Sequence, residues 1–266
     1  MNWALEVDSF TFRIEASSRP LTRRGILATV NSLFDPLGFM APVIGKLILR
    51  QLMCFDKDWD DPIPPDIKYK FLSSKESLET RSNIQIPRPY FKVSLDKFTH
   101  FELHIFSDAS ELAISAVAYM VGVGLGGRHA SFVLGKSKVV PQAGHTIPRL
   151  ELCAAVLAVE LADIIVEHIE ITISEFKFYT DSRIVLGYIH NQSRRFYTYV
   201  ANRIQRIHRS TKPLQWNYIC SSINPADIGS RGLSPAQRLE ISCTNLAVFG
   251  YSIHLIVPIL VDLGNV

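Results

Sequence analysis

Residues 176–185 read FKFYTDSRIV, an apolar strand that ends in Asp181 and leads through Ser182 into an apolar helix. Three further acids stand at comparable joints of strand and helix patterns: Asp108 in HIFSDAS (104–110), Glu151 in IPRLELCAAV (147–156) and Asp227 in NPADIGSRG (224–232). Burying a carboxylate without a partner is costly. Divalent metal ions are a usual compensation, and two bound metals can drive phosphodiester hydrolysis. Each acid taken alone fits a helix cap or a surface position better.

The pattern around these acids predicts a mixed sheet. Three strand candidates come first, and a glycine-rich turn, VGVGLGG (121–127), reads as the tip of a hairpin between the second and the third. Consecutive strands imply antiparallel pairing, whereas strands that follow crossover helices imply parallel addition. We therefore expect an α/β fold with a mixed five-stranded sheet flanked by helices. The expected strands are 101–106, 114–121, 131–140, 176–180 and 214–219.

Residues that commonly begin helices mark the expected helices of the second half of the chain. Pro148 and Glu151 open a long helix, because proline is tolerated in a first turn. Ser182 is expected to cap the next helix, and a further helix spans about 196–209. A last short helix begins at Pro225-Ala226-Asp227. Carboxylates from a strand end, a helix first turn and a second strand end can then converge on one site.

The first 92 residues predict a separate helical region after a short extended start. Apolar residues recur at helical spacing over 22–34 and 37–55, interrupted by Asp35-Pro36. Asp66 is expected to cap a third helix from 67 to about 81, after a proline-rich hinge at 61–66. IPRP at 86–89 reads as a linker.

Charge is distributed unevenly along the 266 residues, although the net charge is only +3. No Asp or Glu occurs from Ser182 to Ala226, and this stretch is rich in arginine. On the helix at 196–209, Arg195, Arg206 and Arg209 fall opposite an apolar stripe. Such a basic face beside a carboxylate cluster suits a polyanion, and we expect these three arginines to bind its backbone. An ordinary solvated surface is the alternative for the arginines taken alone.

The cysteines, the N-terminal segment and the apolar C-terminal segment indicate the cellular compartment. The four cysteines are far apart and form no CxxC pair, which argues against a zinc knuckle and fits a cytoplasmic or nuclear protein with reduced thiols. The start, MNWALEVDSF, lacks the pattern of a secretory signal, so secretion is not expected. The apolar segment 246–263 contains His254 and Pro258, and we favour packing or disorder over a membrane span there.

Several long strings in the second half resemble the ribonuclease H domain of BEL/Pao-type LTR retrotransposon Pol polyproteins. They are SDAS (107–110), GKSKVVP (135–141), TIPRLELCAAVLA (146–158), YTDSRIVLGYI (179–189), RRFYTYVANRIQRIH (194–208) and NPADIGSRGL (224–233). The resemblance implies that Asp108, Glu151, Asp181 and Asp227 hold two Mg²⁺ ions, with Mn²⁺ as a substitute. It also implies hydrolysis of the RNA strand of an RNA–DNA hybrid. Ser110 and Ser182, beside the acids, would touch phosphate or ribose hydroxyls, and the 2′-hydroxyl distinguishes RNA from DNA.

The N-terminal part resembles the same polyproteins, in LTRRGILATVNSLFDPLGFMAPVIGKLILRQL (21–52) and WDDPIP (59–64). This resemblance implies thumb- and connection-like helices that follow a reverse transcriptase palm, and the rest of a Pol polyprotein as a partner. No YxDD-type polymerase pair is present. The Asp-Thr/Ser-Gly loop of an aspartic peptidase is also missing, since Asp8-Ser9-Phe10 lacks the glycine. We expect a helical region at 1–92, a ribonuclease H-like domain at 93–235 and a divergent apolar tail at 236–266.

Two functional hypotheses remain. The intact set of four acids favours a metal-dependent endoribonuclease. The missing polymerase site and the altered tail favour a nucleic-acid-binding remnant without turnover. A peptidase is a distant third hypothesis, and no membrane association is expected.

Overall fold

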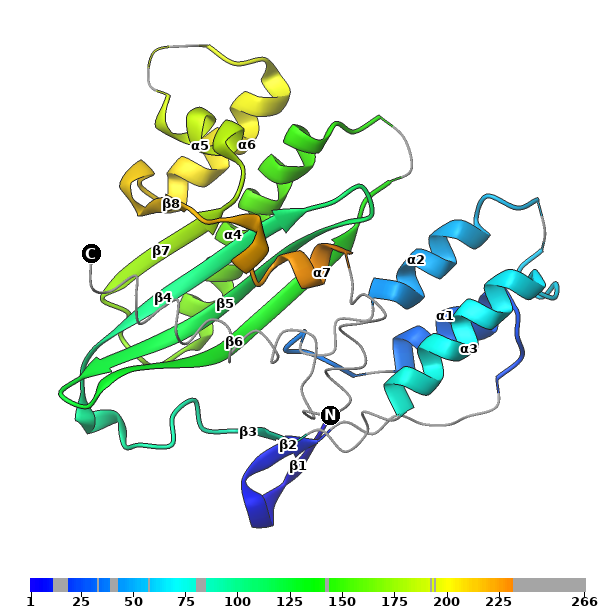
Figure 1. Ribbon diagram of the computed structural model, residues 1–266, viewed down its shortest axis with the longest axis horizontal. Coiled ribbons are helices and arrows are strands. Elements are labelled where there is room, and N and C mark those ends of the chain that lie inside the picture. The colour runs from blue at the N-terminus through cyan, green and yellow to red at the C-terminus, as the bar shows by residue number, and fades with distance from the viewer. Residues whose placement is uncertain are drawn as a thin grey trace. The chain divides into compact units, whose positions relative to one another are not determined.

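The computed structural model describes residues 1–11, 19–32, 34–38, 43–56, 58–79, 85–141, 144–191, 193 and 195–231. The described residues form two compact units (Figure 1). One holds residues up to 36 and from 43 to 89, and the other holds residues 37–38 and those from 90 to 231. The tail expected at 236–266 lies outside the described residues.

The larger unit contains the mixed five-stranded sheet that the sequence predicts. Its order is β6-β5-β4-β7-β8. The first three strands along the chain pair antiparallel, whereas β7 lies parallel to β4 and β8 parallel to β7 (Figure 1). The strands are β4 (Phe98–Ala109), β5 (Ala113–Gly124), β6 (Gly127–Val139), β7 (Glu175–Thr180) and β8 (Trp216–Tyr218). The fifth strand is shorter than expected, because residues 213–215 form a 3₁₀ turn.

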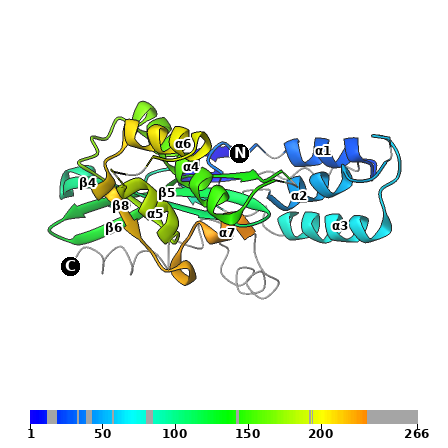
Figure 2. The ribbon, with the colours of Figure 1, turned by 90° about the horizontal axis from the view of Figure 1, so that it is seen from above.

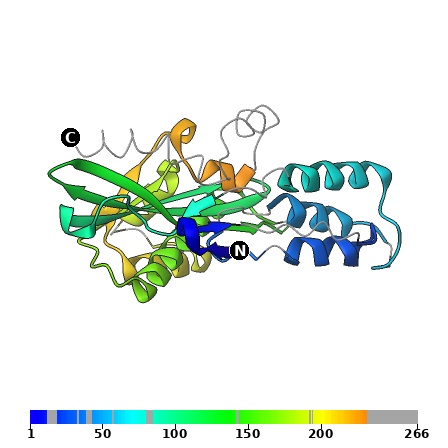
Figure 3. The same ribbon diagram turned by 90° about the horizontal axis from the view of Figure 1, so that it is seen from below.

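Four helices accompany this sheet: α4 (Ile147–His168), α5 (Arg183–His190), α6 (Thr198–Ser210) and α7 (Asp227–Arg231). The first helix packs on β4 and β5, and α6 packs on it in turn. Figures 2 and 3 show α6 and α7 on opposite sides of the sheet. Arg195 and Phe196, which the sequence assigned to the start of the third of these helices, precede it.

Alternation along β4 separates two environments, because successive side chains of a strand point to opposite faces. Leu103 and Ile105 belong to the apolar core that α4 covers with residues such as Leu152 and Leu161. The alternate positions 102, 104, 106 and 108 point to the other face and are all buried. Three of these four side chains, those of Glu102, His104 and Asp108, are polar, so most of the buried polar side chains of β4 lie on this face.

The smaller unit contains more strand than the sequence predicts. Strands β1 (Asn2–Ala4), β2 (Ser9–Thr11) and β3 (Gln85–Pro87) form an antiparallel sheet in that order. Part of the expected linker at 86–89 is therefore a strand. It is held to β2 by main-chain pairing and to Asp8 by the Arg88 guanidinium, 2.6 Å from Asp8 Oδ1.

Three helices complete the smaller unit: α1 (Arg23–Ser32), α2 (Val43–Leu52) and α3 (Pro65–Glu79). Ile26, Ile48, Leu52 and Ile67 are buried together at their contact. The prediction that Asp66 caps the third helix is wrong, because the helix begins at Pro65 and Asp66 lies in its first turn. A proline fits that first position, since its missing N–H would have no partner there. No helix among the described residues combines the length and apolar character needed to cross a membrane.

Candidate active site

Asp108 and Asp181 lie at the same end of two adjacent parallel strands. The last register pair of β4 and β7 is Ser107 with Thr180, and each aspartate follows its member of that pair. The two carboxyl groups are close enough for each to influence the pKa of the other. The sequence pattern placed an acid at the end of each strand, and the parallel pairing brings the two acids together.

Ser182 joins Glu151 to this pair. As the N-cap of α5, its hydroxyl accepts a hydrogen bond from the Val185 N–H at 3.2 Å. The same hydroxyl donates to Glu151 Oε2 at 2.6 Å. The expected cap is confirmed, and it also anchors a carboxylate from the second turn of α4 beside Asp181. Because the Ser182 hydroxyl accepts a hydrogen bond from α5 and donates one to Glu151 on α4, it links the starts of these two helices.

The short helix α7 brings the fourth acid. Asn224 Nδ2 donates to the Ser107 carbonyl at 3.0 Å, which ties the segment before α7 to the end of β4. Ser230, which is buried, donates its hydroxyl hydrogen to Asp108 Oδ2. Asp227 forms an ion pair with Arg231, at 2.5 Å between Oδ1 and Nε.

The charges of these acids act on one another. Burial raises the pKa of Asp108 to about 7, and the negative charges of Asp181 and Asp227 act in the same direction. Burial also raises the pKa of Asp181, with further contributions from the charges of Glu151 and Asp227. Like charges that approach each other in a buried site disfavour ionisation. A cation would remove that penalty.

The donor set suits a hard divalent cation, because all four side chains offer carboxylate oxygens. Asp108, Glu151, Asp181 and Asp227 are the residues that would hold it. In the described part of the chain, however, no three His, Cys, Asp or Glu side chains are close enough to hold one ion together. Ser182, Ser230 and Arg231 instead satisfy three of the carboxylates.

The side chains predicted to bind nucleic acid differ in their exposure and in their partners. Arg195 and Arg209 are exposed, as a backbone contact requires. Arg206 is not free: its Nη2 lies 2.5 Å from Asp163 Oδ2 on α4. Ser110 donates to the Ser230 carbonyl at 2.7 Å and accepts from the Leu112 N–H at 3.0 Å. Its hydroxyl therefore joins the loop between β4 and β5 to α7.

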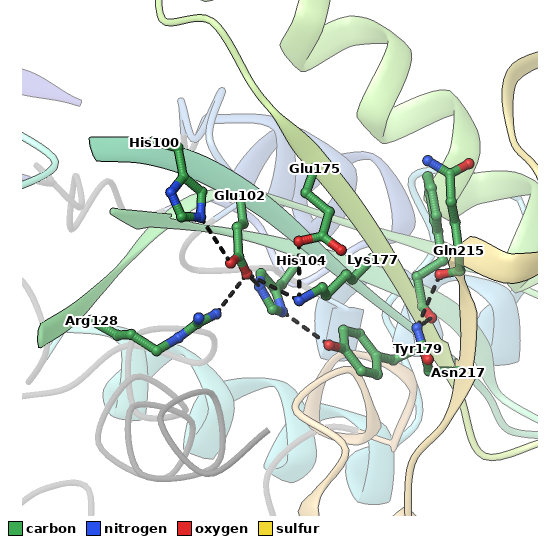
Figure 4. Close-up of polar contacts among 10 residues, drawn as sticks. His100, Glu102, His104, Arg128, Glu175, Lys177, Tyr179, Gln215 and Asn217 are labelled. Atoms are coloured by element: carbon green, nitrogen blue, oxygen red, sulfur yellow. Dashed lines mark hydrogen bonds and ion pairs between the residues drawn. The ribbon is translucent and has the colours of Figure 1, made fainter. Parts of the chain in front are cut away.

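A buried polar cluster centred on Glu102 was not predicted (Figure 4). The Glu102 carboxylate accepts from Arg128 Nη2 at 2.6 Å and His104 Nε2 at 2.7 Å. Lys177 Nζ lies 3.3 Å away, and His104 Nδ1 lies 3.1 Å from the Tyr179 hydroxyl. The signal was present in HFELHIF, where polar side chains occupy alternate positions of a strand. A strand with polar residues on its inner face needs partners from its neighbours.

Charge compensation governs this cluster. Burial alone would raise the pKa of Glu102, but hydrogen bonds from His104 and Arg128 outweigh it and hold that pKa far below its usual range. Burial lowers the pKa of His104, which keeps the imidazole neutral. Burial likewise raises the pKa of Tyr179 well above its usual range. The cluster joins side chains of β4, β6 and β7, which indicates a structural role in holding these strands together.

The mixed sheet, its helices and the acids at the β4–β7 edge define a ribonuclease H-like α/β protein. The family model for the "Pao retrotransposon-like RNaseH-like domain" matches residues 22–182, which is more than half of the chain. The chain therefore belongs to this family. No curated protein matches its sequence.

Solved structures similar to this chain include several ribonucleases H. RNase H1 from Halobacterium salinarum is 14% identical, with 53% of this chain and 98% of that one covered and a TM-score of 0.33. The N-terminal RNase H domain of a Mycobacterium tuberculosis protein is 10% identical, with 54% and 96% covered and a TM-score of 0.36. A foamy viral protease-reverse transcriptase in complex with double-stranded DNA is 11% identical, with 79% and 42% covered and a TM-score of 0.27.

Proposed function

We propose that this chain is a metal-dependent endoribonuclease that hydrolyses the RNA strand of an RNA–DNA hybrid. The observation that carries the proposal is the pairing of Asp108 with Asp181 on adjacent parallel strands, with Glu151 and Asp227 near enough to influence their ionisation. Four carboxylates from four different elements repel one another when ionised, and that repulsion opposes folding. Bound divalent cations would offset this repulsion, which accounts for the cluster.

In this proposal Asp108, Glu151, Asp181 and Asp227 hold two Mg²⁺ ions, or Mn²⁺ in their place. Bound metals of this kind supply an activated water and stabilise the leaving oxygen. The protein's own contribution is positioning. Ser182 orients Glu151 and Ser230 orients Asp108, each through one carboxylate oxygen, which leaves the other oxygen of that carboxylate for a ligand.

The wider setting in this proposal is a retroelement Pol polyprotein. The smaller helical unit would correspond to a thumb- or connection-like region beside a reverse transcriptase palm supplied by the rest of such a polyprotein. The protein would act in the cytoplasm or nucleus, where hybrids form during reverse transcription. Exposed Arg195 and Arg209 would then contact the hybrid's phosphates.

A second candidate function is nucleic-acid binding without turnover. It is favoured by one observation: three of the four acids already have protein partners in Ser182, Ser230 and Arg231. If these contacts persist in solution with metal present, the acids would not bind two ions together. The chain would then hold a hybrid without cutting it.

Cleavage of an end-labelled RNA–DNA hybrid by the full chain separates the two candidates. The wild type should cut the RNA strand in Mg²⁺ or Mn²⁺, not in EDTA, and should spare double-stranded DNA. Asp108→Asn should abolish cleavage and leave hybrid binding intact or tighter, because less negative charge faces the phosphates. Exposed Glu111→Gln, three residues away, is the matched control and should cut normally. A folded wild type that binds hybrid but cuts no better than Asp108→Asn in either metal would establish the second candidate.

A further inference from the structure

One of the four acids at the end of the sheet already has a cation as its partner. The Nε of Arg231 lies 2.5 Å from Oδ1 of Asp227, and the two residues stand four positions apart in α7. In the part of the chain that the structure describes, no other lysine or arginine forms an ion pair with any of the four acids. Arg231 therefore occupies one of the carboxylate oxygens that a metal ion would use.

The charge of Arg231 also acts on a second acid. Burial and the negative charges of Asp181 and Asp227 raise the pKa of Asp108, whereas a hydrogen bond from Ser230 and the positive charge of Arg231 oppose that rise. Asp108 belongs to β4 and Asp227 to α7, so a single guanidinium offsets the repulsion between acids of two elements. In the metal-free protein Arg231 thus does part of what a divalent cation would do in the proposed function.

Helix α7 itself is held in place by other contacts. Asn224, just before the helix, and Ser230 within it are buried and hydrogen-bond to the end of β4. The Arg231 side chain, in contrast, is 61% exposed. Ion pairs at such positions are weak, because water solvates both partners well. Arg231 can therefore leave Asp227 while this acid keeps its place beside β4.

A metal ion and this guanidinium exclude each other at Asp227. Two cations at one carboxylate repel each other, and the repulsion is strong when one of them is divalent and both are in contact with the oxygens. Only molecules in which Arg231 has moved away are ready to bind an ion at Asp227, so the apparent affinity falls with the fraction of molecules in that state. The serine hydroxyls that bind Asp108 and Glu151 are uncharged and impose no such repulsion.

We propose that Arg231 is a built-in competitor of the metal ion at Asp227, which raises the Mg²⁺ concentration at which the acidic site fills. This inference rests on the proposed function for the presence of metal, and it adds a regulatory contact to the same site. In the metal-free protein the guanidinium neutralises Asp227. On metal binding the guanidinium moves into solvent and the carboxylate becomes available as a ligand. The protein partner of Asp227 is then compatible with a role for this acid as a metal ligand.

The test is the affinity of the full chain for Mg²⁺ alone, measured by isothermal titration calorimetry without nucleic acid. Arg231→Gln should lower the apparent dissociation constant by about two- to fivefold, the range expected for the loss of an exposed ion pair. Arg231→Lys keeps the positive charge and should lie closer to the wild type. Arg183→Gln is the matched control. Arg183 is two residues from Asp181, but its guanidinium carbon lies 4.9 Å from the centre of the Tyr218 ring instead of on a carboxylate.

A second measurement follows the guanidinium itself. In NMR spectra of the arginine Nε–H groups, the Arg231 signal is identified by its loss in Arg231→Gln. This proton should exchange slowly with solvent in EDTA, because it is held by Asp227, and Mg²⁺ should restore the fast exchange of a free arginine. The Nε–H of Arg24, which is paired with Asp60 in the smaller unit at 2.8 Å, should not respond to Mg²⁺.

The outcomes separate the competition from the proposed function. An unchanged Mg²⁺ affinity in Arg231→Gln, an equal gain in Arg183→Gln, or an Arg231 Nε–H that exchanges freely in EDTA would each overturn the competition, and a wild type that binds Mg²⁺ would still keep its proposed metal site. If Arg231→Gln binds Mg²⁺ and the wild type does not, the competition stands and the wild type is a binding protein without turnover. If neither binds Mg²⁺ or Mn²⁺, the competition and the proposed function both fail.

Discussion

Asp108 and Asp181 stand side by side because β4 and β7 pair in parallel with Ser107 opposite Thr180. Parallel strands end at the same edge of a sheet, so residues that follow equivalent positions must meet there. The encounter is unfavourable for two ionised carboxylates. Burial raises the pKa of Asp108 to about 7, and the charge of Asp181 adds to that rise. The folded protein therefore carries an electrostatic strain at this edge that the unfolded chain lacks.

The first prediction is that Asp108→Asn stabilises the metal-free protein at alkaline pH. With a folded pKa of about 7 and an ordinary value of 3.8, Asp108 favours folding only while protonated, so stability is lost as pH rises through about 7. The amide does not ionise and keeps an acceptor for Ser230. At one pKa unit per about 1.4 kcal/mol, the gain in unfolding free energy at pH 8 is at most about 4 kcal/mol.

Urea unfolding in EDTA at several pH values measures this gain. It should shrink as the pH falls from about 7 to 5, because the folded wild type then binds a proton that the unfolded chain does not. Glu111→Gln, an exposed acid close in sequence, should show no such trend. A constant difference between Asp108→Asn and wild type at every pH would mean that packing, not charge, separates them.

The second prediction compares two contacts of α7. Ser230 and Asp108 are both buried, so Ser230→Ala removes a hydrogen bond to a carboxylate that water cannot replace. The loss should be about 1.5–3 kcal/mol of unfolding free energy, with Ser230→Thr closer to wild type because it retains the hydroxyl. The side chains of the Arg231–Asp227 pair, by contrast, are 61% and 35% exposed. Arg231→Gln should therefore cost less than about 0.5 kcal/mol. Equal losses in Ser230→Ala and Arg231→Gln would contradict the role assigned to burial.

Much of the larger unit follows from local sequence signals. Alternating and apolar runs predict the strands, and Ser182 before an apolar helix predicts a cap that the structure confirms. Acids placed at element ends predict that Asp108 and Asp181 meet, given parallel pairing. Each of these inferences needs only neighbouring residues plus one topological rule.

What the sequence could not supply is the pairing of distant side chains. Arg206 lies on a helix face that resembles a nucleic-acid contact, yet its partner Asp163 is 43 positions earlier and meets it only once α4 and α6 pack. Ser182 and Glu151 are joined across 31 positions in the same way. In the smaller unit, β3 pairs with a strand more than 70 residues earlier, so a proline-flanked segment that reads as a linker becomes a strand. Such contacts depend on tertiary packing, which no local pattern encodes.

The third prediction concerns the cluster of Glu102. Glu102 is almost fully buried and is the acceptor for Arg128, His104 and Lys177. Glu102→Gln leaves the half-buried Arg128 guanidinium without a counter-charge and leaves Lys177 with Glu175 alone, so we expect a loss of about 3–5 kcal/mol. Glu175→Gln removes an exposed partner of the same Lys177 and should cost less than about 1 kcal/mol.

The pH dependence of this loss distinguishes charge from packing. The folded pKa of Glu102 is held below its ordinary value of 4.5, so its contribution is present above that value and disappears as pH falls below it. The difference between wild type and Glu102→Gln should accordingly shrink in acid, while the difference for Glu175→Gln stays small throughout. A gap that persists unchanged at low pH would assign the cluster a purely steric role.

The last prediction uses metal to reverse the order of stability set by Asp108. In EDTA the wild type should melt below Asp108→Asn at pH 8, since its carboxylates repel one another. A cation bound only by the folded state adds stability as its concentration rises above its dissociation constant, by about 2.7 kcal/mol at a hundredfold excess. Mg²⁺ should therefore raise the melting temperature of the wild type and raise that of Asp108→Asn far less, because the variant has lost both a ligand and the repulsion that metal relieves. Glu102→Gln, altered on the same face of β4 but away from the acids, should respond to Mg²⁺ as the wild type does. Differential scanning fluorimetry across a Mg²⁺ series shows whether the wild-type and Asp108→Asn curves approach and cross. Parallel curves at all concentrations would leave the four carboxylates without a metal and favour binding without turnover.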